Sequence, residues 1–167
     1  GVRGMLLQGG AVDVAEILAL LDRIDTPEPQ VLIELLVLGS VAKADEVLET
    51  SPLPAELAEG LEAILPHENF VALTRAMLRS SSSQRDLGLT TSIGQAAAVE
   101  LFVERIGYDA ENGVATLSGC VLELSPTGPS YAPASASTSI SLATGEYVVL
   151  SSAGANNLLF VLRVSEV

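Results

Sequence analysis

Apolar residues recur at helical spacing near the start of the chain, and a continuous apolar run follows them. The helical stripe is formed by Val14, Ile17, Leu18, Leu21 and Ile24. Asp13 and Glu16 have the spacing of a capping box, so the helix is expected to start near Asp13. After two prolines, residues 30–39 read QVLIELLVLG, which is rich in Val, Ile and Leu and predicts a buried strand.

A compact α/β unit is predicted for residues 1–40. Residues 2–8 are expected to form a short strand that ends at Gly9 and Gly10, before the helix. Within the apolar run, Glu34 is the one carboxylate. A buried acid is costly without a partner, so Glu34 is either a group with a chemical role or a structural carboxylate paired to a backbone donor or a basic residue.

The middle of the chain favours helices. Residues 41–65 are rich in Ala, Glu and Leu and are interrupted by prolines, which predicts a connector of one or two short helices, the second at about 55–64. A further helix is expected in HENFVALTRAMLRS, residues 67–80, where Phe70, Leu73, Met77 and Leu78 form an apolar stripe. The serine-rich residues 80–84 predict a loop.

Everything after residue 84 favours antiparallel strands. Alternating segments are RDLGLTTSI, AVELFVERIGYD, GVATLSGCVLEL, STSISLA, GEYVVLSS and NLLFVLRVSEV. Turns are expected at residues 109–113, at Thr144–Gly145 and at residues 153–157, with a loop at 125–136. The predicted fold class is therefore α+β, with a β-rich domain of about five or six strands within residues 66–167.

Composition narrows the function classes. The 167 residues can bury a sizeable core, and 49% of them are hydrophobic, which excludes a disordered chain. A formal net charge of −13 repels phosphate backbones, so no nucleic-acid partner is expected. No apolar run reaches the roughly 18 residues of a membrane helix, so any membrane contact would come through strands or through a partner.

Candidate chemistry is sparse. His67 and Cys120 are each the only residue of their type, so neither a multi-histidine metal site nor an intrachain disulfide is expected. His67 with Glu68 could act as a general base, but a helix start after Pro66 explains both residues. The serines at 80–83 lack a nucleophile elbow, and QGGAVD at residues 8–13 lacks the lysine of a phosphate loop. No enzyme activity and no cofactor or metal are predicted.

The front segment resembles bacterial secretins, the outer-membrane channel subunits of type II and type III secretion systems and type IV pili. Family members carry a helix that ends in a Leu/Ile-Asp element, a proline-bearing turn and a strand of the form Gln-Val-x-Ile-Glu. The residues on this pattern are Leu21, Ile24, Asp25, Pro27, Gln30, Val31, Ile33 and Glu34. Leu35 stands where Ala is usual, and Gly39 and Ser40 replace a second Glu-Val pair.

The far end resembles the same family. Gly145, Glu146, Val148 and Val149 fall on its turn and Val-Val strand, whereas Ser151–Ser152 and Arg163–Val164 replace Gly-Gly and Thr-Pro. The segment FVALTRAMLRS sits where secretins place the helix that opens the channel domain. The segments that form the inner gate of secretins are missing or reduced, so the chain resembles a shortened member.

The resemblance implies a homo-oligomeric pore or ring in the bacterial cell envelope, in the outer membrane or periplasm, whose subunits pair their sheets into an oligomeric barrel for protein secretion and transport. Other envelope or secretion-system proteins could be further partners. Asp25, Gln30, Ile33, Glu34, Gly145 and Glu146 would then be structural motif residues. Strands with few edge charges, such as TLSGCVLEL, also favour pairing with a partner. Two alternatives remain: a non-conducting periplasmic scaffold that builds rings, and a small hydrolase that uses His67.

Overall fold

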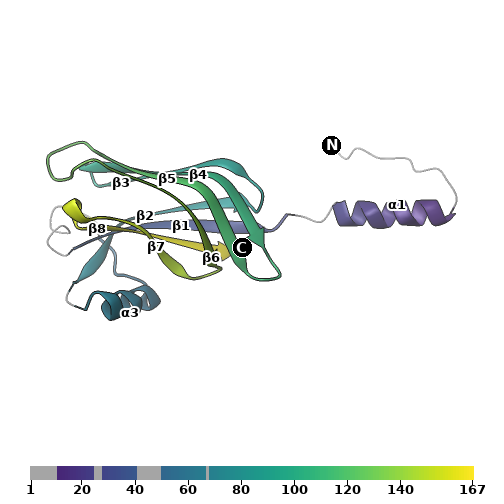
Figure 1. Ribbon diagram of the computed structural model, residues 1–167, viewed down its shortest axis with the longest axis horizontal. Helices are drawn as coiled ribbons and strands as arrows, with labels where there is room; N and C mark the ends of the chain where they lie inside the picture. Colours follow the sequence, from purple (N-terminus) through teal and green to yellow (C-terminus); the bar gives the residue numbers. More distant parts are fainter. Residues whose placement is uncertain (1–10, 25–27, 41–49, 67) are drawn as a thin grey trace.

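The computed structural model describes residues 11–24, 28–40, 50–66 and 68–167. Two four-stranded antiparallel sheets pack face to face, and one helix covers the outside of one sheet (Figure 1). We call the sheet with the strand order β2-β1-β8-β7 sheet A, and the sheet with the order β3-β4-β5-β6 sheet B. The elements are α1 (Ala11–Ile24), β1 (Gln30–Ser40), α3 (Ala55–Ile64), β2 (Phe70–Ser81), β3 (Arg85–Ile93), β4 (Ala97–Asp109), β5 (Val114–Pro126), β6 (Ala134–Ala143), β7 (Tyr147–Ala153), the 3-10 turn η1 (Gly154–Asn156) and β8 (Leu158–Glu166).

The main core lies between the two sheets, because each strand presents one face of alternating apolar residues to the opposite sheet. In β4 and β5 the buried and exposed positions alternate over most of their length. Strand β1 is buried on both faces, as the continuous apolar run predicted. Side chains that meet between the sheets include Val31, Ile33, Leu35, Leu101, Leu117, Phe160 and Leu162.

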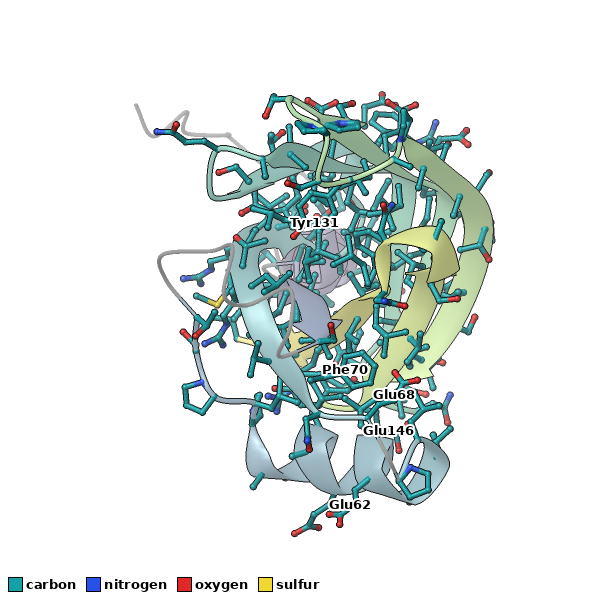
Figure 2. The ribbon with its side chains drawn as sticks, turned by 90° about the vertical axis from the view of Figure 1, so that its left-hand side faces the viewer. Glu62, Glu68, Phe70, Tyr131 and Glu146 are labelled. Carbon is teal, nitrogen blue, oxygen red and sulfur yellow. The ribbon has the colours of Figure 1, made fainter. Side chains whose placement is uncertain are left out.

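A second, smaller core lies between the outer face of sheet A and α3. Helix α3 turns Leu57 and Leu61 toward Leu36, Leu38 and Val161 of the sheet. Phe70 packs against the same cluster, and in Figure 2 it lies between the sheet and the helix, whereas Glu62 points away from the protein. Because Leu36 and Leu38 are covered in this way, both faces of β1 can be apolar.

Strand β1 is a central strand of sheet A, between β2 and β8. The sequence analysis placed this strand in a unit of residues 1–40, but its hydrogen bonds join it to the β-rich part of the chain. Helix α1 lies apart from both sheets (Figure 1). It runs from Ala11 in the described residues, so the helix predicted to start near Asp13 is present, with Asp13 inside its first turn.

The helix predicted over residues 67–80 is wrong, because residues 70–81 form β2. The residues Ala, Leu, Met and Arg favour a helix locally, but tertiary pairing with β1 overrides this propensity. The period-two alternation is visible in the sequence: Ala76 and Leu78 pack on the core, while Arg75, Met77 and Arg79 point outward. The four apolar residues of the predicted stripe, Phe70, Leu73, Met77 and Leu78, lie on both faces of the strand, since Met77 is exposed and Leu78 packs on the core.

Most other predicted elements that fall on described residues are confirmed, although the loops predicted at residues 80–84 and 125–136 are shorter, because β2, β5 and β6 extend into them. Helix α3 occupies residues 55–64, and six strands follow residue 84. The predicted turns at residues 109–113, 144–145 and 153–157 also form. The predicted strand at residues 2–8 and the first helix of the connector lie outside the described residues.

Candidate functional site

The outer face of sheet A carries a row of side chains that crosses all four strands. In register, Met77 of β2 lies beside Glu34 of β1, Glu34 beside Arg163 of β8, and Arg163 beside Tyr147 of β7. Directly opposed side chains on one face of an antiparallel sheet lie close enough to interact. Strand pairing alone therefore places an acid, a base and an aromatic ring in contact.

Glu34 is the buried acid of this row, with only 4% of its surface exposed. The Nε atom of Arg75 lies 2.6 Å from Glu34 Oε1. This oxygen has no hydrogen-bond partner of good geometry, so the contact is an ion pair in which the N–H does not point at the oxygen. Because 54% of the Arg75 side chain is exposed, water screens the pair from one side.

Arg163 joins Glu34 to the edge of the sheet. Its guanidinium donates a 3.1 Å hydrogen bond from Nη1 to the Tyr147 hydroxyl and lies 4.9 Å from the centre of the Tyr147 ring. Such a contact adds a cation–π attraction to the hydrogen bond. The row thus places an ion pair, a hydrogen bond and a cation–π contact on one face of sheet A, while the buried Nε of Arg163 has no hydrogen-bond partner.

The predicted motif residues are spread over the fold rather than gathered at one site. Gln30 opens β1, and Ile33 is 1% exposed in the main core. Gly145 adopts a φ of 89°, and its N–H donates a 2.7 Å hydrogen bond to the carbonyl of Val164. Glu146 follows it and is exposed (Figure 2). Asp25 and His67 lie outside the described residues.

Sequence reasoning found Glu34 but not its partners. Arg75, Arg163 and Tyr147 lie on strands that are far from β1 in the sequence, so only the strand register brings them together. Two signals in the sequence could have pointed to these partners: the alternation of buried and exposed positions along the strands, and the small number of Lys and Arg residues. The chain has eight Lys and Arg in all, and Arg75, Arg79 and Arg163 lie on this one face.

A cleft of about 840 Å³ opens where β2 approaches β3. Arg75 is the one charged side chain at its wall, and no His, Cys, Asp or Glu is among its described lining residues. On the floor, the Thr74 and Thr91 hydroxyls lie 2.6 Å apart and link the two sheets. The lining residues are Leu36, Ser51, Pro52, Pro54, Ala72, Leu73, Thr74, Arg75, Ser92, Gly94, Gln95, Ala96, Gly128 and Ser130.

Titratable and metal-binding chemistry is limited elsewhere in the described part of the chain. Burial raises the pKa of the Cys120 thiol to about 11, so the thiol is protonated at neutral pH. The side chain of Asn112 and its backbone N–H hold the pKa of Asp109 below its usual value. No group of three or more metal-ligating side chains occurs within the described ranges.

Both sheets end in strands without a hydrogen-bonded neighbour on their outer side, apart from one bridge. Sheet A ends at β2 and β7, and sheet B ends at β3 and β6. Ser51 pairs with Ala72 at one point of the β2 edge. Strands β6 and β7 contain no charged residue at all, whereas β2 carries Arg75 and Arg79. Uncharged edges are templates for further strand pairing.

The outward face of sheet B is polar. Phe102, Val114 and Val121 are the large apolar side chains on it, and Glu100 of β4 lies directly opposite Glu123 of β5. The other outward positions of its strands are mostly occupied by Ser, Thr, Gly or Ala, for example Gly88, Thr90, Ser92, Ala98, Thr116, Ser135, Ser137 and Ser141. A lipid-facing sheet would instead carry a continuous apolar band.

Comparison with known proteins identifies the fold. No protein-family model and no curated protein matches the chain. Among solved structures, it is similar to the secretin InvG of the Salmonella SPI-1 type III secretion injectisome, in the open gate state, with a TM-score of 0.51 and 14% sequence identity. The match covers 95% of this chain and 66% of the InvG chain, so this chain spans just under two thirds of that length.

The chain therefore has a secretin-like fold, made mostly of antiparallel sheets with two described helices. Within the described residues, no helix has both the length and the hydropathy of a membrane span.

Proposed function

We propose that the protein is a structural, non-enzymatic subunit of a secretin-like homo-oligomeric pore or ring in the bacterial cell envelope. One observation carries this proposal: in a secretin-like fold, each of two stacked sheets ends in a strand with uncharged, open edge groups. Open edges of this kind need either protection or a partner. A second copy of the chain supplies a partner for each of them.

The strand order supports head-to-tail assembly. All neighbours in sheet A are antiparallel and the sheet has four strands, so β2 and β7 run in opposite directions. When β7 of one copy lies beside β2 of the next, the antiparallel order continues without a break. The same holds for β6 and β3 in sheet B. Repetition of one such heterologous contact closes a ring if the rotation is a whole fraction of a turn.

Charge also favours this pairing. The edges that carry no charge, β6 and β7, would meet the edges that carry Arg75, Arg79, Arg85 and Asp86. Two copies of the same edge would bring arginines together at β2, and their like charges would oppose that contact. The pairing of unlike edges is therefore preferred over the pairing of like edges.

We also propose that this subunit lacks the long gate segments of secretins. From β2 onward the strands are joined by short connections, and the longest of them in residues 68–167 is the seven-residue loop 127–133. A loop of this length does not supply a hairpin that could close a central pore. We place the assembly in the outer membrane or the periplasm, with other secretion-system proteins as further partners and no cofactor.

Electron microscopy and mass measurement of the purified protein test the proposal. Rings of uniform diameter, with a mass that is an integer multiple of 17.3 kDa, are expected. A monodisperse monomer at every concentration would overturn it. A His67→Ala variant should assemble like the parent, because no catalytic step is involved.

A second candidate, a ring-building periplasmic scaffold that conducts nothing, is favoured by the polar outward face of sheet B. That face offers Phe102, Val114 and Val121 in place of an apolar band. Planar-bilayer recordings separate the two functions. Stepwise conductance from purified rings supports the pore, whereas rings without conductance support the scaffold.

A further inference from the structure

Only part of the outer face of sheet A is covered by α3. The covered part holds Leu36, Leu38 and Val161. The remaining part comprises two rows of register partners: Arg79, Leu32 and Ser165 in one row, and Met77, Glu34 and Arg163 in the other. We call these six residues the open half of sheet A. Tyr147, at the end of the second row, packs against the covered cluster. Met77 is 53% exposed there.

Helix α3 shows which kind of element this face accepts. It is an amphipathic helix that buries Leu57 and Leu61 on the sheet and exposes Glu56, Glu59 and Glu62. The apolar stripe meets the aliphatic side chains of the sheet, and the acids remain in water. A second helix of the same type would suit the open half, because Arg79 and the neighbouring Arg75 of β2 are exposed and can screen its acids.

Helix α1 is such a helix, and three of its large apolar side chains are exposed. Ile17, Leu18 and Leu20 are 40%, 50% and 54% exposed. The sequence of α1 carries Asp13, Glu16 and Asp22 against Arg23, a net charge of −2 that complements the arginines of the open half. Surface helices of this pattern usually bury their apolar stripe against another surface.

The dimensions also match. The 14 residues of α1 make a helix about 21 Å long. Four strands spaced about 4.8 Å apart give a sheet roughly 15–20 Å wide. Helix α1 is therefore long enough to lie across sheet A over the open half, beside α3. Helix α1 does not pack on sheet A of its own chain, because it extends away from the two sheets (Figure 1).

We propose that α1 of one copy docks on the open half of sheet A of a second copy, with Leu18 near Met77. This exchange goes beyond the ring of strands proposed above and needs only a second copy of the chain. It would bury Met77 and Leu18 together and place the acidic helix over Arg79 and Arg75. The docked helix would hold neighbouring copies together, either before or after their strands pair.

Cross-linking of mixed single-cysteine variants tests the exchange. Met77→Cys protein is mixed with Leu18→Cys protein that carries a small tag of different mass, and a short bismaleimide reagent is added at neutral pH. The native Cys120 is 1% exposed and protonated, so wild-type protein should give no product. The matched control is Ala19→Cys, an exposed neighbour that lies about 100° further round the axis of α1. Leu18→Cys and Ala19→Cys both lie on the exposed helix α1 and leave the sheets intact.

The expected result is a mixed dimer of Met77→Cys with Leu18→Cys, at several-fold higher yield than with Ala19→Cys and with lower yield at high salt. Equal yields for the two helix positions would overturn the proposal. No mixed product would also overturn it, and so would a cross-link formed only inside a chain that carries both Leu18→Cys and Met77→Cys. Electron microscopy of the same samples reports the ring separately: mixed dimers without rings would support the exchange and contradict the ring.

Discussion

At the scale of single residues, Glu34 is an acid in an almost wholly apolar strand, and its neighbours explain how the strand tolerates it. The carboxylate lies between Arg75 and Arg163, which supply positive charge from both neighbouring strands. Removal of one member of a buried charge pair is costly, because the remaining charge is then left without compensation. The row therefore contributes more to the choice of register than to net stability.

Glu34→Gln should lower the free energy of unfolding by about 1–2 kcal/mol, because the ion pair with Arg75 is lost and the partly buried Arg163, directly opposite, no longer has an acid beside it. Urea denaturation at pH 7 measures the change. The matched control is Glu100→Gln on β4. This acid is exposed and directly opposite Glu123, so its loss should be neutral or slightly stabilising. A neutral Glu34→Gln with a destabilised Glu100→Gln would contradict the account.

Gly39 departs from the secretin pattern for a steric reason. A Cβ atom built on Gly39 would lie 2.5 Å from Leu73 Cδ1, where β1 and β2 have a bulge. Leu73 is a main-core residue with 4% exposure, so it cannot swing away freely. The glycine is thus tied to the packing of β2 on β1.

Gly39→Ala should destabilise the protein by about 1–3 kcal/mol through overpacking. Gly60→Ala on α3 is the control, because nothing lies within 4 Å of its Cβ position. In a helix interior this change should stabilise by about 0.5–1 kcal/mol. Thermal unfolding of both variants measures these effects, and the two shifts in melting temperature should have opposite signs. The cost of Gly39→Ala should shrink in a Leu73→Val background, since the two sites share the same space.

At the scale of elements, two loops are joined by one buried side chain. Asn156 of η1 accepts a 2.7 Å hydrogen bond from the N–H of Ala132 and donates a 2.9 Å bond to the carbonyl of Ala132. Asn156 is 3% exposed, so these bonds are shielded from water. The loop between β5 and β6 is thereby fixed to the turn between β7 and β8, and sheet B is fixed to sheet A.

Asn156→Ala should cost about 1–3 kcal/mol, because it leaves both backbone groups of Ala132 without their partner. Limited proteolysis should cut loop 127–133 faster, and hydrogen exchange there should increase. The neighbouring Asn157 has a φ of 52° and is exposed, so Asn157→Gly should be tolerated within a few tenths of a kcal/mol. Equal proteolysis of the two variants would rule out the proposed link.

Local signals predicted most elements of this fold but not how the strands divide between the sheets. Strands β3 to β8 could be predicted because alternation and turn residues are local properties of the chain. The turn at Thr144–Gly145 looks like a hairpin turn, but β6 and β7 belong to different sheets. The N–H of Gly145 bonds to Val164 of β8, and this contact directs β7 into sheet A. This contact joins residues that are not neighbours in the sequence, so local sequence signals do not predict it.

The same limit applies to β2 and to the candidate site. The sequence of β2 has helical propensity, and it forms a strand because β1 offers a paired, apolar partner. Glu34 could be singled out from the sequence because it is an acid in an apolar run. Its partners could not, because the ion pair with Arg75 and the position of Arg163 opposite Glu34 depend on the register of three strands.

At the scale of the whole molecule, the sheets have open edges on both sides of the fold, and assembly should depend on them. Val149 is 46% exposed on the outer face of β7, an edge strand without any charge. Natural sheets block unwanted edge pairing with lysine at such positions. Val149→Lys should therefore abolish rings and leave a folded monomer, because β7 keeps all its pairing with β8 inside the subunit.

Phe102→Lys provides the matched control for this edge effect. Phe102 is an apolar side chain that is 42% exposed on the outward face of sheet B, but its strand β4 is paired on both sides by β3 and β5. The same change in charge and polarity should then cost at most about 1 kcal/mol of stability, through the lost contact with Val121, and should leave assembly intact. Mass photometry of both variants at matched concentration gives the comparison. If Phe102→Lys dissociates the assembly and Val149→Lys does not, the outward face of sheet B rather than the β7 edge is the contact between copies, and the ring would have to be built by face packing instead of strand pairing.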